Sequence, residues 1–355
     1  MKTYQGAIVG YGGMGHYHYT GILKTPRVKY VGVYDVDPTR MELAKADGIE
    51  KTYPSLEALL ADGELDFILC STPNNFHKDI SIAALRAGKH VICEKPVTMT
   101  SAELAEIMEV QRETGKIFTV HQNRRMDRDF LIVKEAVDTG KLGDVFEVES
   151  RVTGSRGIPE GWRQYAVAGG GMMLDWGVHL IDQTVQLFEA ERIVSVYCHM
   201  YNVVYKECDD GFTLQMLTEK GRQITVEVGT SHYVTAPRWY AFGDRGAVTV
   251  KDWDCSGEMI RAVDRQVTFE EEIIYTKAGP TKTMGPRAKD TVEVTALNPD
   301  DYEPSDYDSY YRRFADTLDG TGPLWVRPEQ AMRVMKIMEA AFQSHRTGEV
   351  IHTDL

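Results

Sequence analysis

Two residues with acid–base side chains, Asp175 and His179, lie four positions apart inside the run Gly169–Asp182. The run predicts a helix, and a spacing of four puts both side chains on one helix face. Histidine titrates closest to neutral pH, and a neighbouring carboxylate can orient it, so the pair fits removal of a proton from a hydroxyl group. Alternatively, the pair only stabilises its helix. A metal is not expected, because a third ligand has no obvious candidate.

A third charged residue, Lys95, follows an apolar strand predicted at 90–93, within Glu94-Lys95-Pro96. At the carboxyl end of a strand, a lysine can donate a hydrogen bond to a reacting oxygen. An isolated lysine is more often a solvated surface charge, which is the alternative here. The catalytic candidates are Lys95 to hold the oxygen, His179 as the base and Asp175 to orient His179.

Gly10-Tyr11-Gly12-Gly13-Met14-Gly15 fits the pattern Gly-x-Gly-x-x-Gly between a predicted strand and a predicted helix. Such glycines let backbone amides approach a pyrophosphate at the positive end of a helix. Asp35 closes the second strand twenty positions after Gly15, where it can accept hydrogen bonds from both adenosine ribose hydroxyls and repel a 2′-phosphate. Together the features predict NAD rather than NADP, although the glycines alone could merely make a tight turn. The candidate contacts here are Gly10, Gly12, Gly13, Met14, Gly15 and Asp35.

Further candidate contacts lie at predicted strand ends and at the junction of the two halves. Ser71-Thr72-Pro73-Asn74 follows the strand predicted at 67–70, and its polar groups either touch the cofactor or simply build a turn. The further cofactor candidates are Ser71, Thr72, Pro73, Asn74, His77, Glu94, Lys95, Trp162 and Arg163. The substrate candidates are Lys95, Asn123, Arg124, Asp175 and His179.

The first third of the chain alternates short apolar strand patterns with helical patterns. That alternation calls for a doubly wound parallel sheet in an α/β fold. The predicted strands are 6–9, 29–34, 67–70, 90–93 and 117–120, and the predicted helices are 17–24, a stretch opened by Pro38, 56–61, 78–87 and 102–114.

After about residue 122 strand-like runs dominate. Strands are predicted at 145–152, 193–200, 212–218, 224–231, 238–242 and 247–251, and helices at 130–139, 307–318 and 328–346. Residues 243–246 suit a hairpin turn, and residues 278–306 are predicted mostly as loop. We expect two domains, residues 1–122 and 123–355, the second an α+β domain with a largely antiparallel sheet.

Composition excludes several classes of partner. The formal net charge of −13, without a basic patch, argues against nucleic acid and anionic membranes. No apolar run approaches membrane-spanning length, and the N-terminus lacks a signal peptide's apolar stretch. The five cysteines are widely spaced without a Cys-x-x-Cys pair, which fits a reducing compartment. We expect a cytoplasmic protein.

These motifs together resemble those of the glucose-fructose oxidoreductase/inositol dehydrogenase/rhizopine-catabolism family, written Gfo/Idh/MocA. The resemblance spans nearly the whole chain. The motifs that carry it, in the family's order, are Gly10–Gly15 with His18, Asp35, Glu94-Lys95-Pro96, Asn123-Arg124-Arg125, Trp162-Arg163, Gly169–Asp182 and the tail 339–344 followed by Gly348.

The resemblance implies an N-terminal Rossmann domain, a C-terminal domain with a large open mixed sheet, and a substrate cleft between them. It implies that Lys95 contacts cofactor and substrate, that Asp175 is a substrate or relay carboxylate, that His179 is the catalytic acid/base, and that the bond before Pro96 is cis. It further implies a sugar or polyol substrate and a homodimer or homotetramer. Trp176 stands where many relatives carry a smaller residue, and would narrow the site.

The leading hypothesis is an NAD-dependent oxidoreductase that transfers a hydride between nicotinamide and a ring hydroxyl carbon of a sugar, glycoside or cyclitol. One alternative is a lyase or hydrolase that keeps NAD bound through a closed redox cycle on a sugar derivative. Another is a non-catalytic NAD-binding regulator, against which the presence of Lys95, Asp175 and His179 argues.

Overall fold

The N-terminal part of the fold is built on a parallel sheet. The computed structural model describes residues 2–264, 273–282, 287–303 and 306–355. Within them, the first sheet has six strands in the order β3-β2-β1-β4-β5-β6, and every neighbouring pair is parallel. The strands are β1 (Tyr4–Val9), β2 (Val28–Tyr34), β3 (Lys51–Thr52), β4 (Phe67–Cys70), β5 (His90–Cys93) and β6 (Phe118–Val120). The predicted doubly wound sheet is confirmed, and the fully buried β4 shows why its sequence is apolar throughout.

The helices of this part begin and end close to the predicted positions, with one exception. They are α1 (Gly13–Gly21), α2 (Pro38–Asp47), α3 (Leu56–Leu60), α4 (His77–Arg86) and α5 (Ser101–Thr114). Helix α1 was predicted to begin at Tyr17, but it begins inside the glycine cluster, where His16 N donates to Gly12 O at 3.0 Å. Glycine's low helix propensity misled the prediction, because the surrounding structure outweighs propensity at this position.

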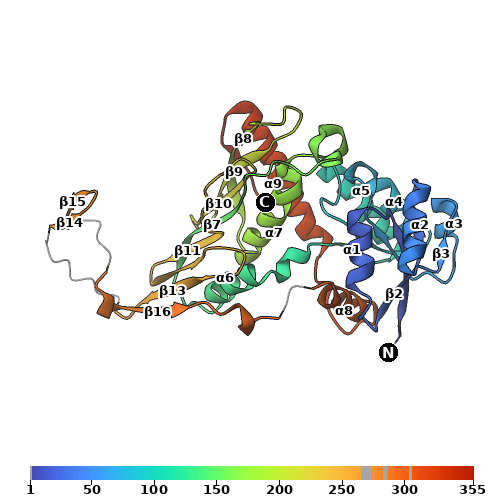
Figure 1. The fold of residues 1–355 in the computed structure, drawn as a ribbon, viewed down its shortest axis with the longest axis horizontal. Helices are drawn as coiled ribbons and strands as arrows, with labels where there is room; N and C mark the ends of the chain where they lie inside the picture. The colour runs from blue at the N-terminus through green and yellow to red at the C-terminus, as the bar shows by residue number, and fades with distance from the viewer. Residues whose placement is uncertain (1, 265–272, 283–286, 304–305) are drawn as a thin grey trace.

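The chain returns to the first sheet near its end. Helix α8 (Tyr307–Leu318) packs against β2 and α1, beside the N-terminal strands (Figure 1). Tyr311 Oη lies 2.5 Å from Tyr30 Oη and 2.6 Å from His18 Nδ1. The division into residues 1–122 and 123–355 stays a prediction. Helix α8 belongs in sequence to residues 123–355, but it packs against elements of residues 1–122.

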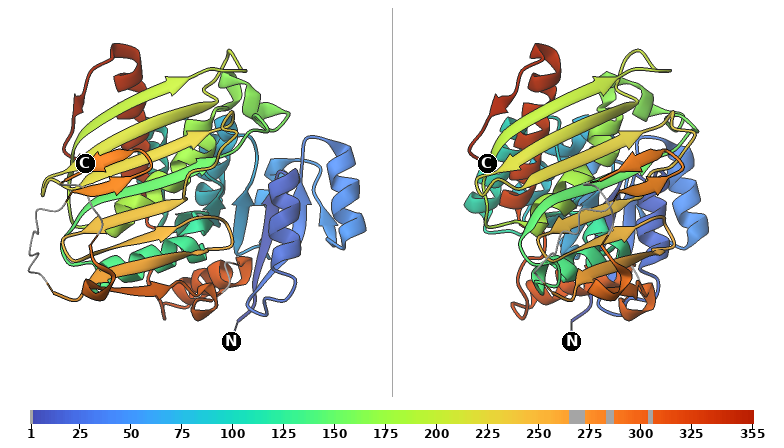
Figure 2. Two further views of the ribbon diagram at one scale, coloured as in Figure 1. Left: turned by 60° about the vertical axis from the view of Figure 1, so that its left-hand side comes forward. Right: turned by 90° about the vertical axis from the view of Figure 1, so that its left-hand side faces the viewer.

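The second sheet is large and mixed. Within the described ranges it has nine strands in the order β16-β13-β12-β11-β7-β10-β9-β8-β17; β7 and β10 pair in parallel and the other neighbours are antiparallel. The strands are β7 (Val145–Thr153), β8 (Ile193–Tyr201), β9 (Gly211–Thr218), β10 (Gln223–Gly229), β11 (Trp239–Gly243), β12 (Gly246–Val250), β13 (Gly257–Ala262), β16 (Val292–Ala296) and β17 (Ile351–His352). Helices α6 (Arg128–Asp138), α7 (Val178–Leu187) and α9 (Pro328–Thr347) pack along it (Figure 2). The predicted fold class is confirmed.

Strand β16 of this half was not singled out from the sequence. Residues 278–306 were predicted mostly as loop, yet Val292–Ala296 forms β16, which pairs with the unpredicted β13 at the sheet edge. Its alternation Val-Glu-Val-Thr-Ala suits a strand, but the surrounding Pro, Gly and Asp hid so short a run. A separate hairpin of β14 (Ile274–Thr276) and β15 (Gly279–Thr281) lies apart from the sheet (Figure 1). Residues 283–286 and 304–305 of the predicted loop lie outside the described residues.

The predicted hairpin at 243–246 is present, and Gly243 pairs with Gly246 around a two-residue turn. None of the helices in the described ranges combines the length and the apolar composition that crossing a bilayer requires.

Candidate functional site

Lys95 and Asp175 form an ion pair between the end of β5 and the segment before α7. Lys95 Nζ lies 3.0 Å from Asp175 Oδ1 and 2.9 Å from the Asp175 backbone oxygen. Arg163 Nε lies 3.3 Å from the same carboxylate oxygen. Burial alone would raise the pKa of Asp175, but Lys95 and Arg163 hold it below its ordinary value, so this carboxyl group is ionised. The peptide bond between Lys95 and Pro96 is cis, as the resemblance implied.

His179 lies in the first turn of α7 and is 5% exposed. Its Nδ1 atom is buried and makes no hydrogen bond with the described residues. Burial, followed by the positive charges of Lys95 and Arg124, lowers the pKa of His179 well below its ordinary value. The ring is therefore neutral at pH 7, and one of its nitrogens can take up a proton.

Asp175 and His179 do not form the hydrogen-bonded pair that their spacing suggested. Asp175 binds Lys95 and Arg163, and within the described part of the chain no hydrogen bond joins it to His179. Met173–Gly177 is a π-helical turn that leads directly into α7. A π turn is wider than the 3.6 residues of an α-helical turn, so a spacing of four no longer stacks two side chains. Asp175 therefore orients Lys95 rather than His179.

The loop before this turn depends on glycine and on a residue that the sequence did not single out. Gly171 has φ +103°, and a Cβ atom on it would lie 2.3 Å from Asp209 Oδ1. Asp209 Oδ2 accepts a hydrogen bond from Met173 N at 2.8 Å, and burial raises the pKa of Asp209 to about 6. Gly170 lies equally close to Arg163, whose backbone oxygen would meet its Cβ at 2.3 Å. Only the packed structure identifies Asp209 as the residue that holds the start of the π turn that carries Asp175.

The glycine loop between β1 and α1 has the room that a pyrophosphate needs. A Cβ atom on Gly12 or Gly13 would meet nothing within 4 Å, so the loop presents open backbone at the start of α1. Gly15 is required for packing instead, because its Cβ would lie 2.3 Å from Gly10 O. Met14 lies between these positions in the first turn of α1. The loop therefore fits NAD, with its backbone amides toward the phosphates.

Asp35 lies beside this loop at the end of β2. Its Oδ2 accepts from Tyr11 N at 2.6 Å, and its Oδ1 accepts from Asp37 N at 2.9 Å. Each carboxylate oxygen can accept a further hydrogen bond, so both remain able to receive a ribose hydroxyl. The predicted role of Asp35 in discriminating against a 2′-phosphate stays a prediction.

The turn after β4 serves largely as a scaffold. Ser71 Oγ donates to Gly10 O at 2.7 Å, which ties the turn to the glycine loop. Asn74 is 2% exposed, and its Nδ2 donates to Gly169 O at 3.0 Å. Thr72 and Pro73 complete the turn between them. Asn74 thereby links the cofactor half of the site to the glycine run before Asp175.

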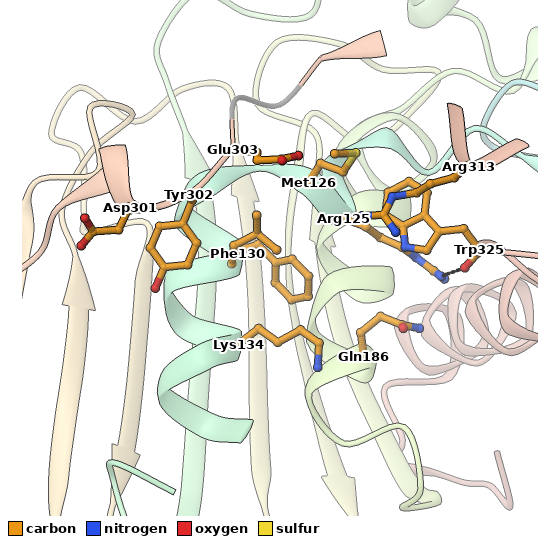
Figure 3. Close-up of a pocket in the computed structure, with 11 residues that line it drawn as sticks. Arg125, Met126, Phe130, Lys134, Gln186, Asp301, Tyr302, Glu303, Arg313 and Trp325 are labelled. Atoms are coloured by element: carbon orange, nitrogen blue, oxygen red, sulfur yellow. Dashed lines mark hydrogen bonds between the residues drawn. The ribbon is translucent and has the colours of Figure 1, made fainter. Parts of the chain in front are cut away.

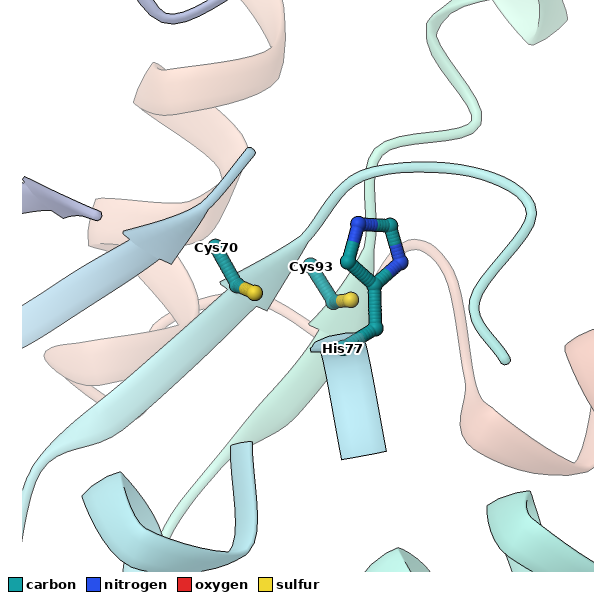
Figure 4. Close-up of side chains that lie close together, drawn as sticks. All are labelled: Cys70, His77 and Cys93. Atoms are coloured by element: carbon teal, nitrogen blue, oxygen red, sulfur yellow. The ribbon is translucent and has the colours of Figure 1, made fainter. Parts of the chain in front are cut away.

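His77 is also a scaffold residue. It is buried, with Nδ1 3.0 Å from Pro96 O and Nε2 2.9 Å from Thr72 O, so it ties the turn after β4 to the turn after β5. Cys70 and Cys93 end these two neighbouring strands beside the His77 ring (Figure 4). The three ligand atoms lie within 4.8 Å of one another, but both ring nitrogens of His77 already face backbone carbonyls, which accounts for the cluster without a metal.

Glu94 is a buried anion next to Lys95 in the chain. Its Oε1 lies 2.7 Å from His18 Nε2 and 2.8 Å from His121 Nδ1, and its Oε2 accepts from Lys95 N at 3.1 Å. Burial opposes its ionisation, but His121 and His18 hold the pKa of Glu94 well below its ordinary value. Burial, followed by the charge of His121, lowers the pKa of His18 to about 4. This cluster supports the turn that carries Lys95, and the expectation of no metal stays a prediction.

Of the remaining candidates, Arg163 contacts the ion pair directly, whereas Arg124 lies beside Trp176. Trp162 and Arg163 lie in a short 3₁₀ turn, where the Arg163 guanidinium sits 4.6 Å from the Trp162 ring centroid. Asn123 and Arg124 share another 3₁₀ turn, and both are half-buried. Arg124 pairs with Asp127 at 2.8 Å.

A cavity of about 390 Å³ is lined by other residues (Figure 3). Its lining includes Phe130, Lys134, Gln186 and Trp325, and none of the predicted catalytic residues. This hollow is therefore separate from the proposed chemistry.

Comparison with known proteins gives a consistent result. Residues 5–122 match the family model described as the oxidoreductase family with an NAD-binding Rossmann fold, and residues 130–249 match the Gfo/Idh/MocA C-terminal domain. The crystal structure of an NAD-binding protein from Listeria innocua is 42% identical, with a TM-score of 0.93 over 99% of this chain and 100% of that one.

Two curated relatives extend the comparison. An uncharacterized oxidoreductase of Schizosaccharomyces pombe is 38% identical over 176 residues, which is 48% of this chain and 48% of that protein, so the chain spans about half its length. The scyllo-inositol 2-dehydrogenase (NADP(+)) of Bacillus subtilis is 26% identical over 99% of this chain and 96% of its own.

Proposed function

Since the chain belongs to the Gfo/Idh/MocA family of NAD-binding oxidoreductases, we propose that it is a dehydrogenase that oxidises a ring hydroxyl of a sugar, glycoside or cyclitol. The observation that supports the proposal is the ion pair of Lys95 and Asp175 just beyond the carboxyl end of β5, with His179 close enough that the charge of Lys95 lowers its pKa. Ligands bind at this edge in doubly wound folds. The inositol dehydrogenase relative supports the substrate class.

The open backbone of Gly12 and Gly13, together with Asp35, would hold NAD, which would supply the acceptor for the hydride that leaves the carbinol carbon. His179 takes the hydroxyl proton as the C–H bond breaks and a carbonyl forms. Because burial keeps His179 neutral, it is ready to act as the base at pH 7.

Lys95 donates a hydrogen bond to the substrate oxygen, and its position is set by Asp175. A fixed ammonium stabilises the negative charge that develops on the oxygen as the proton leaves. Glu94 accepts a hydrogen bond from the backbone N–H of Lys95 and so helps to hold it in place. In the reverse direction the same groups return the proton and stabilise the alkoxide.

The cationic side chains around this site favour an uncharged substrate. Arg163 pairs with Asp175, Arg124 pairs with Asp127, and Arg125 binds Asp182 through two hydrogen bonds of 2.7 and 2.6 Å. A phosphate or carboxylate group would have to compete with these partners for the guanidinium groups.

The test is NADH absorbance after the protein and NAD are mixed with monosaccharides, glycosides, inositols and uronic acids. We expect a signal with at least one neutral ring polyol, and none with Lys95→Ala. Silence across the panel, together with NAD binding shown by calorimetry, would overturn the proposal and favour the closed redox cycle or the regulator.

A further inference from the structure

A pair of tryptophans, Trp176 and Trp253, extends outward from His179. The Trp176 ring centroid lies 6.1 Å from that of His179, and the Trp253 centroid lies 5.7 Å from that of Trp176. Trp176 belongs to the π turn, whereas Trp253 lies in the turn between β12 and β13. We call Trp176 and Trp253 the tryptophan platform. It leads away from the proposed base in two steps.

Two arginines hold the platform. The Arg238 guanidinium lies 3.6 Å from the Trp253 ring centroid, and that of Arg124 lies 4.2 Å from the Trp176 centroid. Such cation–π contacts fix the plane of an aromatic ring. The turn that carries Trp253 is itself closed by hydrogen bonds, since Asp252 Oδ1 accepts from Ser256 N at 3.0 Å. The platform is therefore held in place before any ligand binds.

Both arginines are paired with carboxylates, so their positive charges are neutralised before a ligand binds. Asp129 Oδ2 accepts from Arg238 Nε at 2.8 Å, and both side chains are buried. Asp127 pairs with Arg124 at 2.8 Å. The platform is thus an apolar surface with neutralised surroundings, which suits an uncharged ligand better than an anion.

The Trp253 side chain is exposed to solvent although Arg238 fixes its position. It is 56% exposed, while Arg238 lies against its ring. Trp176 is only partly buried, where it packs against the core. Covering the exposed part of this indole with a ligand would remove apolar area from water, so the tryptophan platform offers a surface on which an uncharged ring can bind.

We propose that the tryptophan platform binds a second ring, linked to the sugar ring that is oxidised next to His179. This inference rests on the proposed function and narrows its substrate class to glycosides that carry a glycosyl or aryl unit. Pyranose and aryl rings share the property that matters, a flat uncharged face that can stack on an indole. Within the described residues no ring contact joins His179 to Trp253, so a single-ring polyol at the base leaves Trp253 uncovered.

The experiment measures binding by calorimetry to the protein loaded with NADH, so that no turnover is needed. The ligands are cellobiose and phenyl β-glucoside, which carry a second ring, and methyl β-glucoside and myo-inositol, which do not. The variants are Trp253→Ala and the matched Trp253→Phe, which keeps an aromatic ring. Because Trp253 is exposed, removing its side chain leaves no cavity in the core.

We expect at least one two-ring ligand to bind the native protein about tenfold more tightly than methyl β-glucoside. In Trp253→Ala the ratio of the two affinities should fall to about one, and Trp253→Phe should retain part of it. Whether cellobiose or phenyl β-glucoside shows the larger ratio identifies the second ring as sugar or aryl. Equal affinities in the native protein, or a ratio unchanged in Trp253→Ala, would overturn the inference.

The outcome separates this inference from the proposed function. A second-ring preference that depends on Trp253, without NADH formation from any glycoside, would support the platform and overturn the dehydrogenase. NADH formation from methyl β-glucoside, without a preference for two-ring ligands, would support the dehydrogenase and overturn the tryptophan platform.

Discussion

Lys95 Nζ lies 3.0 Å from Asp175 Oδ1, and this contact joins residues eighty positions apart. Lys95 follows β5 of the parallel sheet, and Asp175 precedes α7, which packs on the mixed sheet. The pair therefore exists only when the two sheets and their connections are in place. In the proposed chemistry, Lys95 therefore holds the substrate oxygen and is positioned by Asp175, while His179 acts separately as the base.

Replacing Lys95 with alanine should lower kcat by about a hundredfold or more, because the developing charge on the substrate oxygen loses its donor. NAD affinity, measured by fluorescence titration, should change much less than kcat. Lys29→Ala removes an exposed lysine that pairs with Glu50, and serves as the control. A Lys95→Ala variant with full turnover would show that another group holds the oxygen.

Asp175→Asn should act through Lys95. We expect kcat to fall in this variant, and the double variant with Lys95→Ala to lose little more than Lys95→Ala alone, since both changes remove one interaction. When Asp175→Asn is combined with His179→Ala, the two losses in kcat should be closer to additive. A strong coupling of Asp175 to His179, and none to Lys95, would restore the orienting role that the spacing suggested.

The pH profile should reflect a histidine whose pKa is lowered. Oxidation needs neutral His179, so kcat/KM should stay level as the pH falls to about 6.5, the ordinary value for histidine, and decline only below it. Initial rates between about pH 5 and 9 measure this, with stability checked at each pH. An acid limb centred above that ordinary value contradicts the assignment, as does an unchanged limb in a partly active His179→Ala variant.

Asp35→Ser should weaken NAD binding about tenfold, because the variant loses charged acceptors for the ribose hydroxyls. Binding of NADP should improve relative to NAD, since the repulsion of the 2′-phosphate is removed. Calorimetry with both cofactors gives the ratio, and Glu42→Gln on the exposed side of α2 is the control. An unchanged ratio would place the discrimination elsewhere.

Gly171→Ala should impair the site by displacing the turn that carries Asp175. The new Cβ would lie 2.3 Å from Asp209 Oδ1 at a φ of +103°, so the turn that carries Asp175 must shift. We expect a loss of stability on the order of 1–3 kcal/mol and a lower kcat. Gly63→Ala, whose Cβ meets nothing within 4 Å, is the matched control for denaturation and rate measurements. Equal behaviour of the two variants would contradict this account of the loop.

The sequence was informative where structure depends on neighbours along the chain. The helix start at Pro38, the strands at 67–70 and 90–93 and the helix at 307–318 agree with the structure, because short apolar runs and proline act locally. The sequence did not single out β16, where a five-residue strand forms by pairing with β13 inside a stretch predicted mostly as loop. Such pairing depends on a partner that local composition does not reveal.

By itself the sequence determined the cofactor loop, because Gly10–Gly15 and Asp35 belong to one β-α-β unit whose geometry follows from local spacing. It also identified Lys95, Asp175 and His179 as candidate catalytic residues, but it did not reveal which of them contact one another. Only the tertiary structure paired Asp175 with Lys95, assigned Asp209 to the loop before them, and brought Trp253 beside Trp176. The physical reason is that these contacts join distant segments, and the packing of the whole chain decides them.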